Sequence, residues 1–342
     1  MTIKVIQVGI GGMGNAWLGA VQASDHVEFA GFVEINDDIA AEQVNTYGLD
    51  GSTIYKTLAE ALSAIEADGI INVTPPQFHR EVSITAMEAG VPVLSEKPLA
   101  GTLEDSHAIV DKANETGVLH MVTQNYRYTP LAQTVKRMLD GNDLGAIGAV
   151  NVHFAKGPHF GGFREEMPHP LIIDMAIHHF DMMRFFLDSN PARIFATSWN
   201  PPWSWYRGDA SATVHTTFES GVPVTYNGSW CSQGMETTWN ANWRFECERG
   251  ILTIEDDAVC VQRYTGVEDR PGYRHVSNAE QEAVPLVSMA REAQDYLLHE
   301  FYEAVTMGNA PATTAQDNIH TIRFVFDIVN ACDTGQIITT GE

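Results

Sequence analysis

Three residues carry the clearest chemical signal in this chain: Lys97, Asp174 and His178. An ammonium group can stabilise alkoxide charge on a substrate oxygen, and an imidazole can take or give a proton near neutral pH. Asp174 and His178 are four residues apart in the apolar segment 171–187, which predicts a helix carrying both, with Asp181, on one face. Because a carboxylate–imidazole pair in apolar surroundings is costly unless satisfied, such pairs concentrate at functional sites. We expect Asp174 to orient His178, and His178 to move a hydroxyl proton.

Two other roles are open for this pair. A lone histidine on an apolar helix is often a satisfied core residue, and an i, i+4 Asp–His pair can bind a metal ion. Three further histidines lie nearby in the sequence: His159, His169 and His179. Hydride transfer assisted by Lys97 needs no metal, so we expect none. His179 points about 140° away from Asp174 on a helical wheel, which favours a packing or surface role.

Lys97 belongs to the sequence Ser95-Glu96-Lys97-Pro98, directly after a strand expected over 91–95. Ligands of parallel sheets bind outside the carboxyl ends of the strands, so we expect Lys97 to face a cofactor crevice and to contact the substrate. Pro98 fixes the backbone beyond it through a cis or a trans bond. A Glu-Lys pair in a loop is usually solvated surface, and only this location favours a functional role.

The hexapeptide Gly9-Ile10-Gly11-Gly12-Met13-Gly14 fits the pattern G-x-G-x-x-G between a strand and a helix. Gly9 permits the tight turn, Gly11 lets the backbone approach a pyrophosphate, and Gly14 allows close packing of helix on strand. The helix start, with Gly12 and Met13, offers N–H groups to phosphates. A glycine turn without a ligand is the alternative.

Glu34 follows Gly14 by 20 residues, at the end of the second expected strand. A carboxylate there accepts hydrogen bonds from adenosine ribose hydroxyls and repels a 2′-phosphate. Because no Lys or Arg occurs between Lys4 and Lys56, we expect no local cation that could hold the phosphate of NADP. The sequence therefore predicts NAD as the cofactor.

The first 124 residues alternate strand-like and helix-like segments. Strands are expected over 3–8, 27–33, 69–73, 91–95 and 118–122. Thr57 and Thr102 begin capping sequences that open two of the helices between them. This alternation predicts a doubly wound parallel α/β sheet, a Rossmann domain over residues 1–124.

The pattern changes after residue 124 and becomes mostly β. Strands are expected over 148–155, 192–199, 211–218, 222–230, 243–248, 250–255 and 259–264. Helices are expected over 131–139, 171–187, 289–307 and 314–332. Residues 125–342 are therefore predicted to form an α+β domain with a large open, mainly antiparallel sheet.

Composition limits the partners of the chain. Its 342 residues include 20 Lys and Arg against 44 Asp and Glu, a net charge of −24, which disfavours nucleic acid and membrane surfaces. The same charge would also suit a salty cytoplasm. The four cysteines lack zinc-like spacing, and neither a secretion signal nor an apolar run of about 20 residues occurs. We expect a cytoplasmic protein with reduced thiols.

Together these motifs resemble the Gfo/Idh/MocA family, the relatives of glucose–fructose oxidoreductase and inositol dehydrogenase. The matching segments are Gly9–Gly14, Thr74–His79, Glu96-Lys97-Pro98, Gln124-Asn125-Tyr126-Arg127-Tyr128 and Asp174-x-x-x-His178-x-x-Asp181. The resemblance implies Lys97, Asp174 and His178 as the catalytic set and a sheet that forms a homodimer or homotetramer. It also implies a group of residues along the length of NAD: Thr74, Pro75, His79, Glu96 and Asn125. Tyr126 stands where many relatives have Arg.

Substrate contacts are expected beyond the catalytic set. Arg127 belongs to the matching motif, and Arg164 lies in the segment 159–169 that precedes the catalytic helix and is expected to form a substrate wall. An aromatic-rich tract follows between residues 199 and 243 and includes Trp199, Trp203, Trp205, Tyr206, Trp230, Trp239 and Trp243. They suit stacking on sugar faces and packing of a core or interface equally well.

The leading hypothesis is an NAD(H)-dependent oxidoreductase that interconverts a secondary alcohol and a ketone or aldehyde on a sugar, inositol or related polyol. A second is a glycoside-cleaving enzyme, in which transient oxidation acidifies a neighbouring C–H and promotes elimination. A third is an NAD-sensing regulator, although a sensor has no need of the proton-transfer groups at Lys97 and His178.

Overall fold

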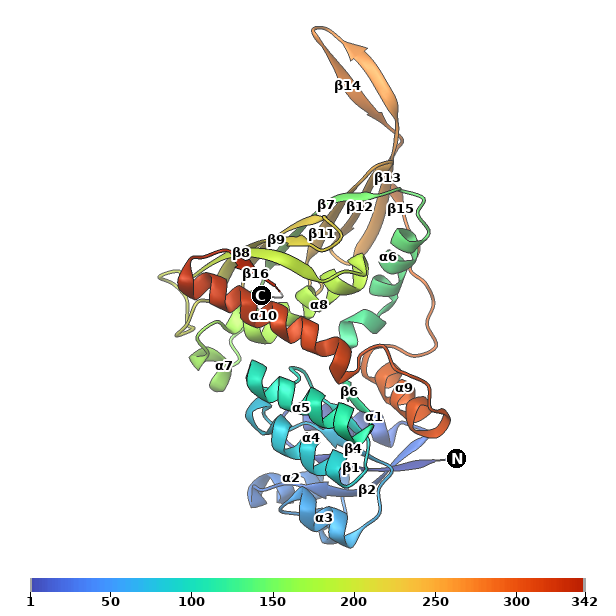
Figure 1. Cartoon of the computed structure of the whole chain (residues 1–342), viewed down its shortest axis with the longest axis vertical. Coiled ribbons are helices and arrows are strands. Elements are labelled where there is room, and N and C mark those ends of the chain that lie inside the picture. Colours follow the sequence, from blue (N-terminus) through green and yellow to red (C-terminus); the bar gives the residue numbers. More distant parts are fainter. Residues whose placement is uncertain (1, 341–342) are drawn as a thin grey trace. The chain divides into compact units, whose positions relative to one another are not determined.

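The computed structural model describes residues 2–340, which form two compact units (Figure 1). The first contains the chain up to Tyr128 together with Ala290–Ile322, and the second contains Thr129–Met289 and the residues from Arg323 onward. The sequence predicted one domain boundary, between residues 124 and 125, and did not predict that the chain returns to the first unit.

The first unit is built on a six-stranded sheet in the order β3-β2-β1-β4-β5-β6. Its strands are β1 (Ile3–Val8), β2 (Val27–Val33), β3 (Ile54–Tyr55), β4 (Gly69–Asn72), β5 (Val93–Ser95) and β6 (His120–Val122). All five pairings are parallel. The strand order reverses between β1 and β4, and a ligand crevice is expected at the carboxyl ends there. The predicted Rossmann sheet is confirmed.

Helices connect these strands: α1 (Gly14–Gln22), α2 (Asp37–Tyr47), α3 (Leu58–Ala64), α4 (His79–Glu88) and α5 (Leu103–Thr116). The predicted capping sequences are confirmed. The Thr57 hydroxyl accepts a hydrogen bond from the Glu60 N–H in a reciprocal capping box, and the Thr102 hydroxyl accepts one from the Asp105 N–H. Each cap satisfies an N–H group that has no carbonyl partner within its helix.

Helix α9 (Ala293–Met307) completes the core of the first unit. Its Leu297, Leu298 and Phe301 are almost fully buried in one cluster with Trp17 of α1 and Ile3 of β1. Helix α10 (Ala315–Thr334) follows and crosses from the first unit into the second. Burial of this apolar surface explains why residues 290–322 pack with a domain that ends far earlier in the sequence, at Tyr128.

The second unit contains the predicted large open sheet, in the order β14-β13-β12-β11-β7-β10-β9-β8-β16, with β15 beside β13. Its strands are β7 (Ile147–Ala155), β8 (Pro191–Trp199), β9 (Ser211–Phe218), β10 (Pro223–Ser229), β11 (Asn242–Cys247), β12 (Gly250–Glu255), β13 (Ala258–Arg270), β14 (Tyr273–Asn278), β15 (Glu282–Ala283) and β16 (Ile338–Thr339). Only the β7–β10 pair is parallel among the described strands of this sheet, so the sheet is mainly antiparallel, as predicted.

One face of this sheet is covered by helices. Figure 1 shows α6 (Pro130–Asp140) and α8 (Ala176–Leu187) on the same side of it, and the short α7 (Phe163–Glu166) lies near α8. Side chains alternate along the central strands between this buried face, as at Val152, and an exposed face, as at Asn151 and His153. The exposed face of this open sheet carries polar side chains at Asn151 and His153 of β7 and large apolar ones at Phe195 and Trp199 of β8.

Strands β13 and β14 extend beyond the sheet as a hairpin, which we call the arm (residues 265–277; Figure 1). The sequence predicted a strand only over 259–264. Most arm residues are exposed on both faces, so they lack the alternation of apolar and polar residues that marks a half-buried strand. The turn at Pro271-Gly272 is typical of a hairpin.

Two further features concern the state of the cysteines and the length of the helices. All four cysteines are free thiols, with Cys231 buried and the other three partly buried. Within residues 2–340, no helix has the length and apolar character needed to cross a membrane.

Candidate active site

The predicted helix 171–187 is not a single α-helix. Residues Leu171–Met175 form a π-helical turn in which the Ala176 N–H bonds to the Leu171 carbonyl, and α8 begins only at Ala176. The prediction that Asp174, His178 and Asp181 share a regular helix was therefore wrong at Asp174. A π-turn inserts one extra residue and rotates the side chains that precede it, and such turns are frequent at functional sites.

Asp174 and His178 both lie in mostly buried surroundings. The Asp174 carboxylate accepts a hydrogen bond from Arg164 Nε at 2.6 Å, and this carboxylate is 12% exposed. His178 is 8% exposed in the first turn of α8. Asp181 is 1% exposed and lies 3.8 Å from Arg184, an ion pair inside the helix layer. The structure thus joins two predicted site residues, Arg164 and Asp174, directly.

The three neighbouring histidines each have other partners. His159 stacks on Trp205, with ring centroids 3.7 Å apart, and His169 Nε2 lies 3.0 Å from the Asp333 carboxylate. His179 is fully buried and bonds to the Trp239 carbonyl at 2.9 Å, and burial lowers its pKa to about 4. In the part of the chain that the structure describes, no group of three or more His, Cys, Asp or Glu side chains is arranged to hold a metal ion.

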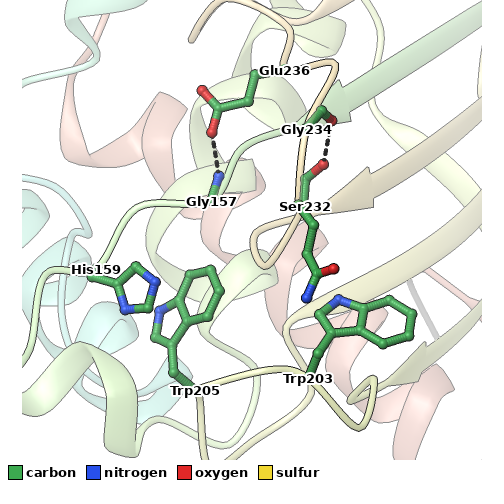
Figure 2. A pocket seen from close by; sticks show the side chains of 8 residues that line it. Gly157, His159, Trp203, Trp205, Ser232, Gly234 and Glu236 are labelled. Atoms are coloured by element: carbon green, nitrogen blue, oxygen red, sulfur yellow. Dashed lines mark hydrogen bonds between the residues drawn. The ribbon is translucent and has the colours of Figure 1, made fainter.

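A pocket opens beside this segment, where the loops after β7, β8 and β10 meet (Figure 2). We call it the aromatic pocket. It is lined by His159, Trp203, Trp205, Ser232, Gln233 and Glu236 with nearby glycines. Trp203 is 56% exposed, whereas Trp230 is fully buried against Tyr206. The predicted aromatic tract therefore contains both packing residues and residues that line a pocket.

The glycine turn of the first unit closes tightly. Gly9 has φ +87°, and a Cβ atom there would lie 2.8 Å from the Val73 carbonyl oxygen. A Cβ atom on Gly14 would lie 2.6 Å from the Gly9 oxygen. The fully buried Gln7 side chain donates to the carbonyls of Gly9 at 3.0 Å and Gly14 at 2.9 Å. The sequence analysis did not identify Gln7, although an amide side chain inside an otherwise apolar strand could have indicated its role.

The outer side of the turn is open. Gly12 has φ +46°, and a Cβ atom added there would meet no described heavy atom within 4 Å. Met13, which precedes α1, is 45% exposed. A Cβ atom on Gly11 would lie 3.3 Å from the Ile39 side chain. The first turn of α1 contains no acidic residue, so the backbone N–H groups at the start of this helix suit the binding of a pyrophosphate.

Glu34 lies beside the turn and is 8% exposed. Its carboxylate accepts hydrogen bonds from the Ile10 N–H at 3.2 Å and the Asn36 N–H at 3.0 Å. Both contacts fix the carboxylate at the carboxyl end of β2, where the sequence analysis placed it.

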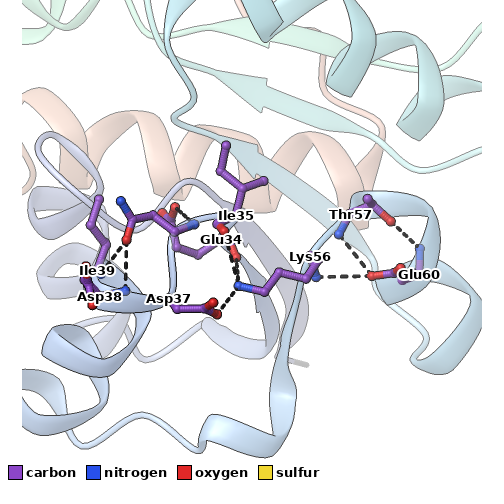
Figure 3. A network of polar contacts seen from close by, with 9 residues as sticks. Glu34, Ile35, Asp37, Asp38, Ile39, Lys56, Thr57 and Glu60 are labelled. Carbon is purple, nitrogen blue, oxygen red and sulfur yellow. Dashed lines mark hydrogen bonds and ion pairs between the residues drawn. The ribbon is translucent and has the colours of Figure 1, made fainter.

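Lys56 brings a positive charge close to Glu34. Its ammonium group donates to the carbonyls of Glu34 at 3.2 Å and Ile35 at 3.3 Å and pairs with Asp37 at 2.5 Å (Figure 3). The expectation that no cation lies near Glu34 was therefore wrong. Parallel pairing of β2 with β3 brings Lys56 there from 22 residues away. Asp37 neutralises this cation within the same network.

Two loops at the carboxyl edge are tied together by His79. The fully buried ring has one nitrogen 2.7 Å from the Thr74 carbonyl and the other 2.8 Å from the Pro98 carbonyl. Burial lowers the pKa of His79, and the two carbonyl groups oppose this shift. Thr74 also bonds through its hydroxyl to the Asn72 side chain at 2.7 Å, and Pro75 is exposed. His79 thus positions the loops, while Thr74 and Pro75 lie nearer the surface.

Glu96 fixes the position of Lys97. One oxygen of the buried Glu96 carboxylate accepts the Trp17 indole N–H at 2.8 Å, and the other accepts the Lys97 backbone N–H at 3.1 Å. The Lys97–Pro98 peptide bond is cis. Trp17 is a positioning residue that sequence reasoning missed, because a tryptophan on an apolar helix face indicates core packing.

In the motif after β6, Asn125 is partly buried at the start of a 3₁₀ turn (Asn125–Tyr128). Arg127 in the same turn bonds to Asp317 of α10 at 2.8 Å, and its side chain is 6% exposed. Arg127 therefore presents little surface to a substrate and holds the first turn of α10 in place. Tyr128 stacks on Tyr296 of α9.

Known protein families match both parts of the chain. The model described as an oxidoreductase family with an NAD-binding Rossmann fold matches residues 3–124, and the GFO/IDH/MocA C-terminal domain matches residues 132–253. This chain belongs to the Gfo/Idh/MocA family. As a Gfo/Idh/MocA protein it is an NAD-dependent oxidoreductase, and the predicted family, fold class and cofactor are confirmed.

Relatives of this Gfo/Idh/MocA protein include sugar and polyol enzymes. A 1,5-anhydro-D-fructose reductase of Ensifer adhaerens is 24% identical over 335 residues, which cover 96% of each chain. A scyllo-inositol 2-dehydrogenase (NAD(+)) of Bacillus subtilis is 31% identical over 176 residues, 48% of each chain.

Solved structures share the fold over the whole length. An oxidoreductase from Agrobacterium radiobacter, in complex with NAD+, L-tartaric acid and magnesium, has a TM-score of 0.85 at 19% identity and covers 100% of this chain and 99% of that one. A WlbA dehydrogenase from Bordetella pertussis, in complex with NADH and UDP-GlcNAcA, has a TM-score of 0.81 at 16% identity and covers 100% of both chains.

Proposed function

We propose that this Gfo/Idh/MocA protein interconverts a secondary alcohol and a ketone or aldehyde on a sugar, inositol or related polyol. The observation that carries the proposal is the position of Lys97. It directly follows β5, at the same carboxyl edge of the sheet as the glycine turn after β1. An ammonium group at that edge lies where parallel sheets bind their ligands. The named sugar and inositol relatives support this substrate class.

The residues of the first unit fit a dinucleotide. In this proposal the turn Gly9–Gly14 holds the pyrophosphate, and Glu34 accepts hydrogen bonds from the adenosine ribose. Further along the cofactor lie Thr74, Pro75, Glu96 and Asn125, with His79 holding their loops. When bound, the cofactor supplies hydride transfer at its nicotinamide ring.

The chain's own residues then handle charge and protons. Oxidation of a CH–OH group to C=O removes a hydride from carbon and a proton from oxygen. We propose that Lys97 donates a hydrogen bond to this oxygen and stabilises its negative charge, while His178 takes the proton. Asp174, fixed by Arg164 at 2.6 Å, stabilises the resulting imidazolium.

Incubation with NAD+ and a panel of cyclic polyols and aldoses tests the proposal. NADH absorbance should appear with at least one of them, or NADH should be consumed with the matching ketone. Lys97→Ala should keep cofactor affinity and lose turnover by about 100-fold or more, the usual scale for a general acid–base group. Lys4→Ala, which removes an exposed lysine of the same unit, is the control. Lack of turnover with every substrate in both directions would refute the proposal.

A glycoside-cleaving activity is the second candidate, and the aromatic pocket beside Asp174 favours it because a glycoside extends beyond one ring. The same residues would oxidise the sugar transiently and so acidify a neighbouring C–H. Release of aglycone without net formation of NADH would distinguish it from the dehydrogenase. An NAD sensor would instead retain its behaviour in Lys97→Ala.

We also propose that the protein is a homodimer or homotetramer, with the arm docked on a second copy. An isolated two-stranded hairpin is marginally stable in water, and the arm exposes the directly paired Val267 and Val276, each nearly half exposed. Its charged residues are Glu268, Asp269, Arg270 and Arg274, so the arm is neutral in a chain of net charge −24. A neutral arm avoids the repulsion that a second acidic surface would impose.

Light scattering during size-exclusion chromatography tests this assembly. Replacing Val267 and Val276 by Ser should reduce the mass of the particle. The matched control replaces Glu268 and His275, the pair on the opposite face of the hairpin, by Ser. A wild-type monomer would refute the assembly, and an unchanged oligomer in the Val variant would refute the role of the arm.

A further inference from the structure

The aromatic pocket is an opening in the second unit that the site described above does not use, with a volume of about 530 Å³. This volume lies in the range of ligand pockets, about 300–1,000 Å³. Its floor is formed by Trp203 and Trp205, and Glu236 lies across from them (Figure 2).

Both tryptophans are held with their rings presented to the pocket. The Trp203 indole N–H donates to the Cys231 carbonyl at 3.2 Å, and the Trp205 indole N–H donates to the Pro158 carbonyl at 3.1 Å. His159 stacks on Trp205 with an interplanar angle of 18°. Since the polar edge of Trp203 is satisfied by the protein, its half-exposed ring offers an apolar face to a ligand.

The opposite side of the pocket is polar and rigid. The Glu236 carboxylate accepts a hydrogen bond from the Gly157 N–H at 2.8 Å and pairs with Lys156 at 2.9 Å, and the bond to Lys156 lowers its pKa. A Cβ atom on Gly157 would lie 2.3 Å from the Ser232 carbonyl oxygen, so the two loops touch. An ionised acceptor facing an indole ring favours a neutral ligand with hydroxyl groups on its edge and C–H groups on its face. A pyranose ring has this chemistry.

One segment of the chain links the pocket lining to Asp174. His159 is followed by Phe160, whose ring lies 5.4 Å from the Arg164 guanidinium, and Arg164 bonds to Asp174. One segment of chain therefore lines the pocket and fixes the carboxylate.

We infer that the aromatic pocket binds the second sugar ring of a glycoside whose first ring reacts at Asp174 and His178. This inference rests on the proposed function and names its substrate class as disaccharides or longer glycosides. Trp203 is then a specificity-determining residue that contacts the non-reacting ring.

The test uses the full-length protein with cellobiose, maltose and trehalose as two-ring probes and glucose as the single-ring probe. Binding is measured by saturation-transfer NMR and calorimetry without cofactor, and kcat/KM is measured with NAD+. Trp203→Ala should weaken binding of at least one disaccharide about 3- to 10-fold, the scale of one aromatic contact. Its kcat and KM for glucose should stay unchanged, and Trp203→Phe should restore most of the binding.

Trp199→Ala is the matched control, because Trp199 is similarly exposed but lies on β8 outside the pocket. The inference would be overturned if Trp203→Ala weakened binding of the one-ring and two-ring probes equally. It would also be overturned if binding of no disaccharide depended on Trp203. Turnover of single sugars, together with disaccharide binding that does not depend on Trp203, would refute the inference and leave the proposed function standing. Trp203-dependent binding of a disaccharide without any turnover would support the pocket and refute the proposed function.

Discussion

Cofactor choice depends on the three charges around the end of β2, and removing two of them should change it. We consider the double variant Glu34→Gln/Asp37→Asn. The amide oxygen introduced by Glu34→Gln would still accept the Ile10 N–H, so the turn should stay folded. Loss of Asp37, whose side chain is 91% exposed, releases the ammonium group of Lys56 from its ion pair.

The expected shift can be estimated from these contacts. Hydrogen bonds to a charged group contribute about 1.5–3 kcal/mol and neutral ones about 0.5–1.5 kcal/mol, so binding of NAD should weaken by about 1 kcal/mol. Two like charges about 4 Å apart repel by about 1 kcal/mol in bulk water and about 4 kcal/mol near a protein surface, so binding of NADP should improve by at least about 1 kcal/mol. The sum of at least about 2 kcal/mol corresponds to roughly a 30-fold change in the preference for NADP over NAD.

The assay compares kcat/KM for NAD+ and NADP+ at one saturating polyol concentration, and cofactor Kd values from fluorescence quenching. Glu42→Gln, which removes an exposed charge elsewhere on α2, is the control and should leave the ratio unchanged. A ratio of NADP+ to NAD+ preference in the double variant within about threefold of wild type, with unchanged thermal stability, would refute the assignment of Glu34 to the ribose site.

Three further predictions concern stability. Burial lowers the pKa of His120 to about 3 and of His179 to about 4, so between those values and pH 6.5 the unfolded state binds more protons than the folded state. Each group should therefore lower the free energy of unfolding by about 2 kcal/mol at pH 5. In urea unfolding, His120→Asn and His179→Gln should each lose less stability between pH 7.5 and pH 5 than the wild type does. Trp17→Phe should lower the free energy of unfolding by about 1.5–3 kcal/mol, because the buried carboxylate of Glu96 loses a donor; an unchanged melting curve would contradict this. Phe301→Ala should cost about 3–5 kcal/mol in chemical denaturation and Phe301→Leu distinctly less, because a fully buried ring leaves a cavity.

Local signals in the sequence predicted much of the first unit. Strands β1 and β2 begin and end at the residues expected from the sequence, and the glycine turn occupies the position that its spacing required. These features depend on residues close together in the chain. Periodicity, capping residues and glycine spacing are therefore enough to predict them.

Features created by distant pairing were not predictable in this way. Lys56 reaches Glu34 only because β3 pairs with β2, and residues 290–322 join the first unit only because α9 covers an exposed part of its core. The π-turn before α8 has the same apolar composition as an α-helix, so hydrophobic periodicity cannot distinguish them. The arm lacks any buried face and therefore any periodicity.

The return of the chain through α9 has a consequence for biosynthesis. A ribosome releases the six strands of the first sheet early in translation, but Leu297, Leu298 and Phe301 emerge only after strands β7 to β15. Until then the nascent domain exposes the apolar surface around Trp17 that these residues cover. Domains usually fold in order during synthesis, whereas here the domain begun first is completed only after most of the second unit has been made.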